Sequence, residues 1–327
     1  MLLKFFKGLT PAILATIILT SLLIWGKSLF SPEVFSFYFD NYPMPLYVLI
    51  KSLMGEHTLI EKIVALIITI ASALYLIQLN TKHILIKYRT YLPVLLYIIF
   101  TSSFIPLQRI NPAVFASPFL ILATDNLLTS YENKNSLNYF FRASFYIGIG
   151  SMIYLPLTVF IVLAFISLII LNNTGIRQWF VVLFGFITPW TFAFIYYFIW
   201  HNSGTILFKI IEQSLLPIGE NIFHGVAFTI FYSFIGLLLV ISLLFLLGNL
   251  PTQKINIRKY YSLFIWMVLF SAIIFLFSSF SSIEMVYLAA IPSTFIVANY
   301  FTFAKNKFWP ELFFSVMLVL VILIQFF

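Results

Sequence analysis

The sequence predicts an all-α protein, a polytopic integral membrane helix bundle that forms a single transmembrane domain over residues 1–327. Its composition carries this prediction: 62% of the residues are hydrophobic, 9% are charged, and the mean hydropathy is +1.06. Soluble domains average about 45–50% apolar and about 25% charged residues. So few charges cannot cover a surface that faces water. The composition therefore excludes a soluble enzyme, a nucleic-acid-binding domain and a disordered chain.

Long apolar runs, separated by prolines, charges and polar turns, set the number of crossings. A helix needs about 20 apolar residues to cross a hydrocarbon core of about 30 Å, and runs without polar alternation exclude a membrane β-barrel. No small-residue cleavage site follows the first run, so we expect it to be retained as a span. The runs predict about eleven transmembrane helices, near 8–30, 59–80, 91–107, 112–130, 138–155, 156–172, 178–200, 222–248, 261–280, 284–303 and 308–327.

The stretch 137–171 is either one long tilted helix or two short helices broken at Leu155-Pro156, because proline removes a backbone donor and clashes with the preceding turn. If the stretch is broken, most Lys and Arg residues, including the cluster at 254–259, lie on the same side of the membrane. Without the break, this cluster moves to the other side and the asymmetry weakens. Since cytoplasmic loops are rich in Lys and Arg, the charge pattern favours the break. It predicts a bacterial inner-membrane protein with a cytoplasmic N-terminus and a periplasmic C-terminus.

Two acidic residues lie within a predicted span or at its boundary. Asp125 lies near the inner end of the span 112–130. Acids inside spans mark functional or paired positions, but a carboxylate this close to the end can also reach inner water, and both interpretations stay open. Glu284 is the first residue of the span 284–303 and is expected on the outer side or at its boundary, together with most of the other acids.

Two longer connections, 31–58 and 201–221, are predicted as non-helical outer segments, apart from a surface helix from Val48 to Gly55. All inner loops are short, so we expect any chemistry at the outer face. The first segment carries Glu33 and Asp40 at the mouth of the membrane. A carboxylate there can activate an acceptor hydroxyl as a base, or hold a divalent cation that bridges a phosphate. Alternatively, these acids only solvate the loop.

The residues that follow these acids carry a resemblance. The run Tyr42-Pro-Met-Pro-Leu-Tyr47, followed by Gly55 and an apolar span, resembles the first outer loop of the GT-C superfamily of membrane glycosyltransferases. In that loop an acidic residue precedes a His-Pro-Pro-Leu-Tyr-like turn. The run from Gly148 to Pro156 is similar to a glycine- and proline-containing helix pair of the same enzymes. The resemblance covers about the first 200 residues, and the whole chain is also similar to an uncharacterised family of Bacteroidota membrane proteins.

The GT-C resemblance implies roles for particular residues. It makes Asp40 and Glu33 the catalytic acids, and it places Tyr42 and Tyr47 in the substrate-binding turn. It implies a polyprenyl-phosphate sugar donor, with no certain cofactor beyond the divalent cation already considered. The chain departs from the superfamily in the loop Pro106-Leu-Gln-Arg109-Ile-Asn111-Pro112, where an amide stands at the place of an expected acid.

In this second loop Arg109 and Asn111 are the candidate substrate-binding residues. An arginine can clamp a phosphate with two parallel hydrogen bonds, which suits a lipid phosphate. The alternative is that Arg109 only reaches toward the lipid headgroups. An amide at position 111 cannot act as a base, so the fold can persist where catalysis is lost.

Three function classes remain. The first is a GT-C-like protein that handles a lipid-linked sugar at the outer face, as a glycosyltransferase or without catalysis. The second is a non-catalytic membrane subunit or scaffold of an envelope assembly, with a protein partner. A transporter is disfavoured because acids at mid-span are nearly absent. The net charge of +8 is scattered between apolar runs, which argues against a nucleic-acid partner, and the four scattered histidines with no cysteine predict no metal centre.

Overall fold

A computed structural model describes residues 2–8, 10–30, 43–54, 58–131, 133–201, 205–215, 225–277 and 283–325. Every regular element in these residues is helical, which confirms the predicted all-α class. The elements are α1 (Leu2–Phe6), α2 (Pro11–Phe30), α4 (Pro45–Met54), α5 (Thr58–His83), α6 (Leu92–Ser102), η1 (Ile105–Leu107), α7 (Pro112–Thr129), α8 (Ser136–Ser151), η2 (Leu155–Val159), α9 (Phe160–Ile170), α10 (Ile176–His201), α11 (Thr205–Leu215), α12 (Val226–Asn249), η3 (Leu250–Thr252), α13 (Ile255–Phe277), η4 (Ile283–Met285), α14 (Val286–Phe303) and α15 (Phe308–Ile324).

Seven helical stretches among the described residues are long and apolar enough to cross a membrane. They are Pro11–Phe30, Thr58–His83, Pro112–Thr129, Ile176–Trp200, Val226–Thr252, Ile255–Leu276 and Ile283–Phe303. Several of them leave much apolar surface uncovered: in the most apolar window of α10 only 22% of the residues are buried, against 78% in that of α14. A helix that is apolar all round and packed on one side only fits a lipid environment.

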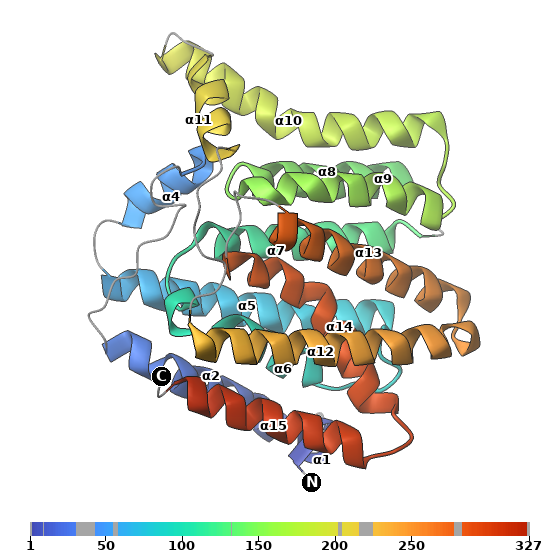
Figure 1. Ribbon diagram of the computed structural model, residues 1–327. Helices are drawn as coiled ribbons and strands as arrows, with labels where there is room; N and C mark the ends of the chain where they lie inside the picture. The colour runs from blue at the N-terminus through green and yellow to red at the C-terminus, as the bar shows by residue number, and fades with distance from the viewer. Residues whose placement is uncertain are drawn as a thin grey trace.

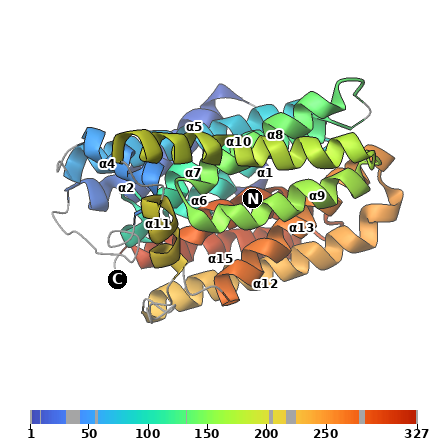
Figure 2. The ribbon, with the colours of Figure 1, turned by 90° about the horizontal axis from the view of Figure 1, so that it is seen from above.

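The helices lie side by side, with α10 at one edge and α1, α2 and α15 at the opposite edge (Figures 1 and 2). The short helix α6 lies in the interior, and all eleven of its residues are buried. Helix α14 packs against α6, α7, α12 and α13. The core of the bundle is therefore built around α6 and α14, while the longer apolar helices cover it.

The amphipathic helices α4 and α11 meet at one end of the bundle, which we call the α4–α11 end (Figure 1). The Ser214 hydroxyl of α11 lies 3.5 Å from the Met44 sulfur beside α4, and the Leu46 amide of α4 donates to the Met152 carbonyl after α8. Thus the two predicted outer segments share one end. The prediction that 201–221 is non-helical is wrong, because α11 occupies 205–215. The predicted surface helix from Val48 begins earlier, at Pro45.

The stretch 137–171 consists of two helices, as the charge pattern predicts. Helix α8 ends at Ser151, four residues before the expected Leu155, and η2 begins at Leu155. The irregular turn between them places Pro156 in the first turn of η2, where a missing backbone donor leaves no helical hydrogen bond unmade. The break is thus confirmed, with its position shifted.

Helices α8 and α10 approach each other closely through glycine. A Cβ atom added at Gly148 of α8 would lie 2.7 Å from the Phe186 carbonyl oxygen and 3.0 Å from the Pro189 Cγ atom, both in α10. Small residues of this kind let membrane helices pack backbone to backbone. Gly26 of α2, by contrast, has nothing within 4 Å of the same position.

We therefore expect Gly148→Ala to destabilise the protein by about 1–3 kcal/mol, because the two helices must separate to admit the methyl group. The matched substitution Gly26→Ala should be neutral or slightly stabilising, since alanine favours a helix by up to about 1 kcal/mol. Thermal unfolding of both variants in the same detergent measures the difference. Equal midpoints for the two variants would contradict the close α8–α10 contact.

Candidate functional site

The segment between α6 and α7, residues 103–111, is the main irregular backbone inside the bundle, and we call it the α6–α7 segment. Helix α6 has eleven residues and so covers about 16 Å at 1.5 Å per residue, roughly half of a hydrocarbon core. Irregular backbone buried between membrane helices needs hydrogen-bond partners from the protein, because lipid offers none. The segment is therefore stable only where other parts of the protein supply hydrogen-bond partners for its backbone.

Side chains from three other helices and from the residue after α15 supply those partners. The Gln325 amide after α15 donates to the Ser103 carbonyl at 2.9 Å, and the Tyr287 hydroxyl of α14 donates to the Leu107 carbonyl at 3.0 Å. From α2 and α4, the Ser28 hydroxyl reaches the Gln108 carbonyl at 3.2 Å, and the Tyr47 hydroxyl reaches the Ile110 carbonyl at 3.5 Å. Four carbonyls of the segment thus meet donors from distant parts of the chain.

Gln108 and Lys62 extend this network into the core. The Gln108 side chain is fully buried, and its amide nitrogen donates to the carbonyls of Ser102 in α6 and Ile24 in α2. The buried Lys62 of α5 donates to the Ser28 carbonyl at 2.6 Å. Because Ser28 in turn donates to Gln108, the network ties α2, α5 and the α6–α7 segment together.

Three of the predicted site residues converge at this segment: Tyr47, Arg109 and Asn111. Tyr47 is 1% exposed and approaches the segment from α4, whereas Arg109 and Asn111 belong to the segment itself. The other predicted residues, Glu33, Asp40 and Tyr42, lie outside the described residues. The three predicted site residues that the structure describes therefore lie at one place in the fold.

Asn111 has a structural task that the sequence analysis did not foresee. Its side-chain oxygen accepts from the Val114 amide at 2.9 Å, so Asn111 is the N-cap of α7. Its side-chain nitrogen lies 3.4 Å from the Leu107 carbonyl and 3.3 Å from the Arg109 carbonyl. Both polar atoms of this buried amide are engaged, and the cap fixes where the irregular segment ends.

Glu284 is a buried carboxylate at the same end that the sequence analysis treated only as an outer acid. It is 1% exposed in η4, which packs against α7, α13 and α14. The Tyr154 hydroxyl, in the break between α8 and η2, donates to its carboxylate at 3.2 Å. The sequence places an acid directly before an apolar span, but it does not show that a tyrosine 130 positions earlier reaches it.

An apolar cavity of about 220 Å³ lies in the half of the bundle nearest the α4–α11 end. It is lined by Phe100 of α6 and by parts of three helices, within 228–239 of α12, 268–275 of α13 and 285–293 of η4 and α14. The Phe228 ring contacts the Phe104 ring of the α6–α7 segment, with centroids 4.9 Å apart. The cavity wall therefore touches the segment that carries Arg109.

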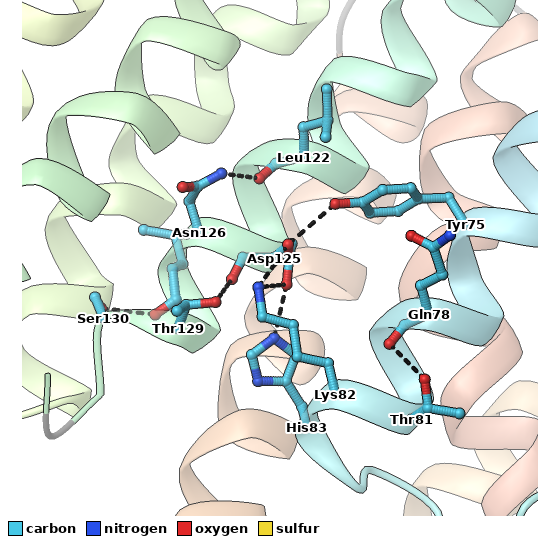
Figure 3. A network of polar contacts seen from close by, with 11 residues as sticks. Tyr75, Gln78, Thr81, Lys82, His83, Leu122, Asp125, Asn126, Thr129 and Ser130 are labelled. Carbon is cyan, nitrogen blue, oxygen red and sulfur yellow. Dashed lines mark hydrogen bonds and ion pairs between the residues drawn. The ribbon is translucent and has the colours of Figure 1, made fainter.

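A second polar cluster lies at the opposite end, where α5 and α7 finish (Figure 3). The Asp125 carboxylate of α7 accepts from Lys82 with both oxygens at 2.9 Å, from His83 at 2.8 Å and from the Tyr75 hydroxyl at 3.0 Å. Of the two interpretations left open for Asp125, the paired one is confirmed. A pocket of about 400 Å³ lies beside this cluster and is lined by Tyr75, Gln78, Leu79, Thr81, Lys82 and Asp125.

The sequence analysis missed Lys82 and His83 as partners of Asp125. The sequence did predict that Asp125, Lys82 and His83 all lie at the inner ends of spans, and this shared position was the only sign that they could meet. Helices α5 and α7 are not consecutive spans, so their contact was not predictable from chain order. In the described residues no group of three or more His, Cys, Asp or Glu side chains is placed to hold a metal ion.

The chain matches DUF6427, a family of unknown function, over residues 28–327. A search of the curated proteins finds no match, and neither does a search of the solved structures.

Proposed function

The chain belongs to the DUF6427 family, and we propose that it binds a lipid-linked sugar of the polyprenyl-phosphate class at the α4–α11 end. One observation carries this proposal: an apolar cavity between membrane helices borders the buried segment that bears Arg109. An isoprenoid phosphate needs the same combination, an apolar channel for the chain and a cation at its mouth for the phosphate.

The size of the cavity fits one part of such a lipid. Pockets for whole drug-sized ligands measure about 300–1,000 Å³, so about 220 Å³ accommodates a segment of the chain while the rest lies among the surrounding lipids. Its polar lining groups are few and include Ser271 and Ser293. Arg109 belongs to the segment whose Phe104 contacts the cavity wall, and in this proposal its guanidinium makes two parallel charge-assisted hydrogen bonds to the phosphate.

In the enzymatic form of the proposal the fold is GT-C-like and the protein is a glycosyltransferase. Asp40, with Glu33, then acts on the acceptor hydroxyl as a base, and Tyr42 and Tyr47 shape the turn that holds the substrate. The second candidate is a non-catalytic subunit or scaffold of a bacterial envelope assembly. The capping role of Asn111 favours it, because a side chain that caps α7 does not replace the acid expected at this position.

The proposal includes eleven crossings in a bacterial inner membrane. Besides the seven long stretches, α6, α8, η2 with α9, and α15 lie in the four remaining predicted ranges. The termini support an odd number: the Leu3 amide contacts Glu311 at the start of α15, whereas Gln325, after its end, contacts Lys27 and Ser103. The end that holds Lys82 then faces the cytoplasm, and the α4–α11 end faces the periplasm.

The topology is testable with single cysteines, since the natural chain has none. A cysteine at Lys209, exposed on α11, should react with a membrane-impermeant maleimide in cells whose outer membrane is permeable. Cysteines at the exposed positions Lys87 and Thr252 should react only after the inner membrane is opened. Labelling of position 252 with positions 87 and 209 silent would make 137–171 a single crossing and refute the eleven-span arrangement. Labelling of both 87 and 252 with 209 silent would reverse the orientation.

Filling the cavity should expel the lipid chain. Gly236 lines the cavity and has nothing within 4 Å of an added Cβ atom, and Gly248, on the same helix outside the cavity, is equally open. We expect Gly236→Leu to lower the retention of polyprenyl phosphate by about tenfold, as mass spectrometry of the gently extracted protein measures it. Gly248→Leu should retain it as the natural protein does, and equal retention in both variants would contradict the cavity as the binding site.

Arg109 distinguishes phosphate recognition from anchoring at the interface. Arg109→Lys keeps the charge but replaces a planar fork with a point charge, so retention should fall by about tenfold. Arg109→Gln should be only slightly weaker than that. If lysine is silent and only glutamine lowers retention per folded protein, a charge at headgroup depth suffices and Arg109 is an anchor.

A further inference from the structure

The pocket between α5 and α7, which we call the α5–α7 pocket, has an accessible cation on its wall. The Lys82 side chain is 49% exposed, whereas that of Asp125 is 12% exposed. Gln78 and Thr81, which also line the pocket, are exposed on the same face of α5. The pocket thus presents an ammonium group, an amide and a hydroxyl to a ligand, while the carboxylate is mostly buried. Figure 3 shows it among its partners Lys82, His83 and Tyr75.

Asp125 does not make this pocket a cation site. Its two oxygens already accept four hydrogen bonds from three side chains, those of Lys82, His83 and Tyr75. A carboxylate so supplied with donors has its charge compensated. Asp125 instead fixes the position of the Lys82 ammonium group at the pocket. Without this ion pair, the long lysine side chain would move freely in solvent.

The surroundings of the pocket are cationic. The connection after α5 carries the exposed residues Lys87 and Arg89, the connection after α7 carries the exposed Lys134, and the first half of α8 carries the exposed Arg142. Against these cations stand Asp125 and, in the sequence, Glu132. An excess of positive charge at a membrane surface attracts anions, and basic pockets between helices bind anionic lipid headgroups.

An apolar strip leads away from the pocket along α5. Ala71 is exposed about two turns before Gln78. Ile67, one turn further from the pocket, is 58% exposed. These residues lie on the same helical face as Gln78 and Lys82, because positions 67, 71, 78 and 82 differ by nearly whole turns. A ligand in the pocket can therefore extend an acyl chain along an uncovered apolar face of α5.

We propose that the α5–α7 pocket binds the phosphate group of an anionic phospholipid from the leaflet at this end of the bundle. Lys82 contacts the phosphate, Gln78 and Thr81 contact the polar headgroup, and Asp125 is a positioning residue that fixes the ammonium group. This site is independent of the lipid-linked sugar proposed for the α4–α11 end, since it shares no residue with that site and lies at the far ends of α5 and α7.

The test uses the full-length protein in nanodiscs that contain phosphatidylglycerol or phosphatidylcholine. After gentle release, native mass spectrometry counts the phospholipids retained per protein. We expect preferential retention of phosphatidylglycerol, and Lys82→Gln should weaken it about fivefold, the effect of about 1 kcal/mol for one lysine near an anionic surface. Lys87→Gln removes the same charge from an exposed position that does not line the pocket, so it should lower retention less than Lys82→Gln does.

Lys82→Arg keeps a cation beside Asp125, so it should fold and retain the lipid. It is the variant to measure if Lys82→Gln fails to fold. Equal retention of the two phospholipids would overturn the proposal, and so would an equal loss in Lys82→Gln and Lys87→Gln. Inorganic phosphate supplies the third arm. If it displaces phosphatidylglycerol at equal concentration, the pocket is a site for free phosphate and not for a lipid.

Discussion

The need to satisfy irregular backbone inside a membrane bundle governs this structure. Helix α6 ends after about 16 Å, and the chain then runs through the α6–α7 segment, in which only the short η1 is helical, before α7 begins at Pro112. Lipid cannot bond the carbonyls that this leaves open. Donors from α2, α4, α14 and the residue after α15 do so instead. Helices from both ends of the sequence are therefore fixed around one segment.

This constraint accounts for the order among the seven long stretches, in which the most buried ones are not the most apolar ones. Helix α14 has a hydropathy of 1.4 and is 78% buried, whereas the stretch that contains α12 has a hydropathy of 2.7 and is 28% buried. Polar groups such as the Tyr287 hydroxyl must lie inside to reach the α6–α7 segment, so the helices that carry them form the core. The most apolar helices need no such partners and cover the outside, where lipid solvates them.

The sequence predicted the helices well because hydropathy and proline act locally. The break near Pro156 and the helix after Pro45 follow from residues within one or two turns. It missed α11, whose Lys209 and Glu212 interrupt the apolar run although Leu207, Ile211 and Ser214 recur at helical spacing. It could not predict Asp125 with Lys82, or Glu284 with Tyr154, because these pairs join helices that are not consecutive, and hydropathy contains no information about which helices are neighbours.

The two polar sites illustrate different solutions to the same problem of placing charge in a bundle. At the α4–α11 end, neutral donors stabilise bent backbone, and Arg109 adds its charge to a segment whose carbonyls are already bonded. At the other end, Lys82 and Asp125 compensate each other directly, with the cation left more accessible than the anion. At the second end, the ion pair leaves a lysine accessible beside an exposed apolar strip without burying an unpaired charge. A phosphate, the ligand that we propose for each end, would therefore meet a cation held by its own ion pair at one end and a cation carried on a bent segment at the other.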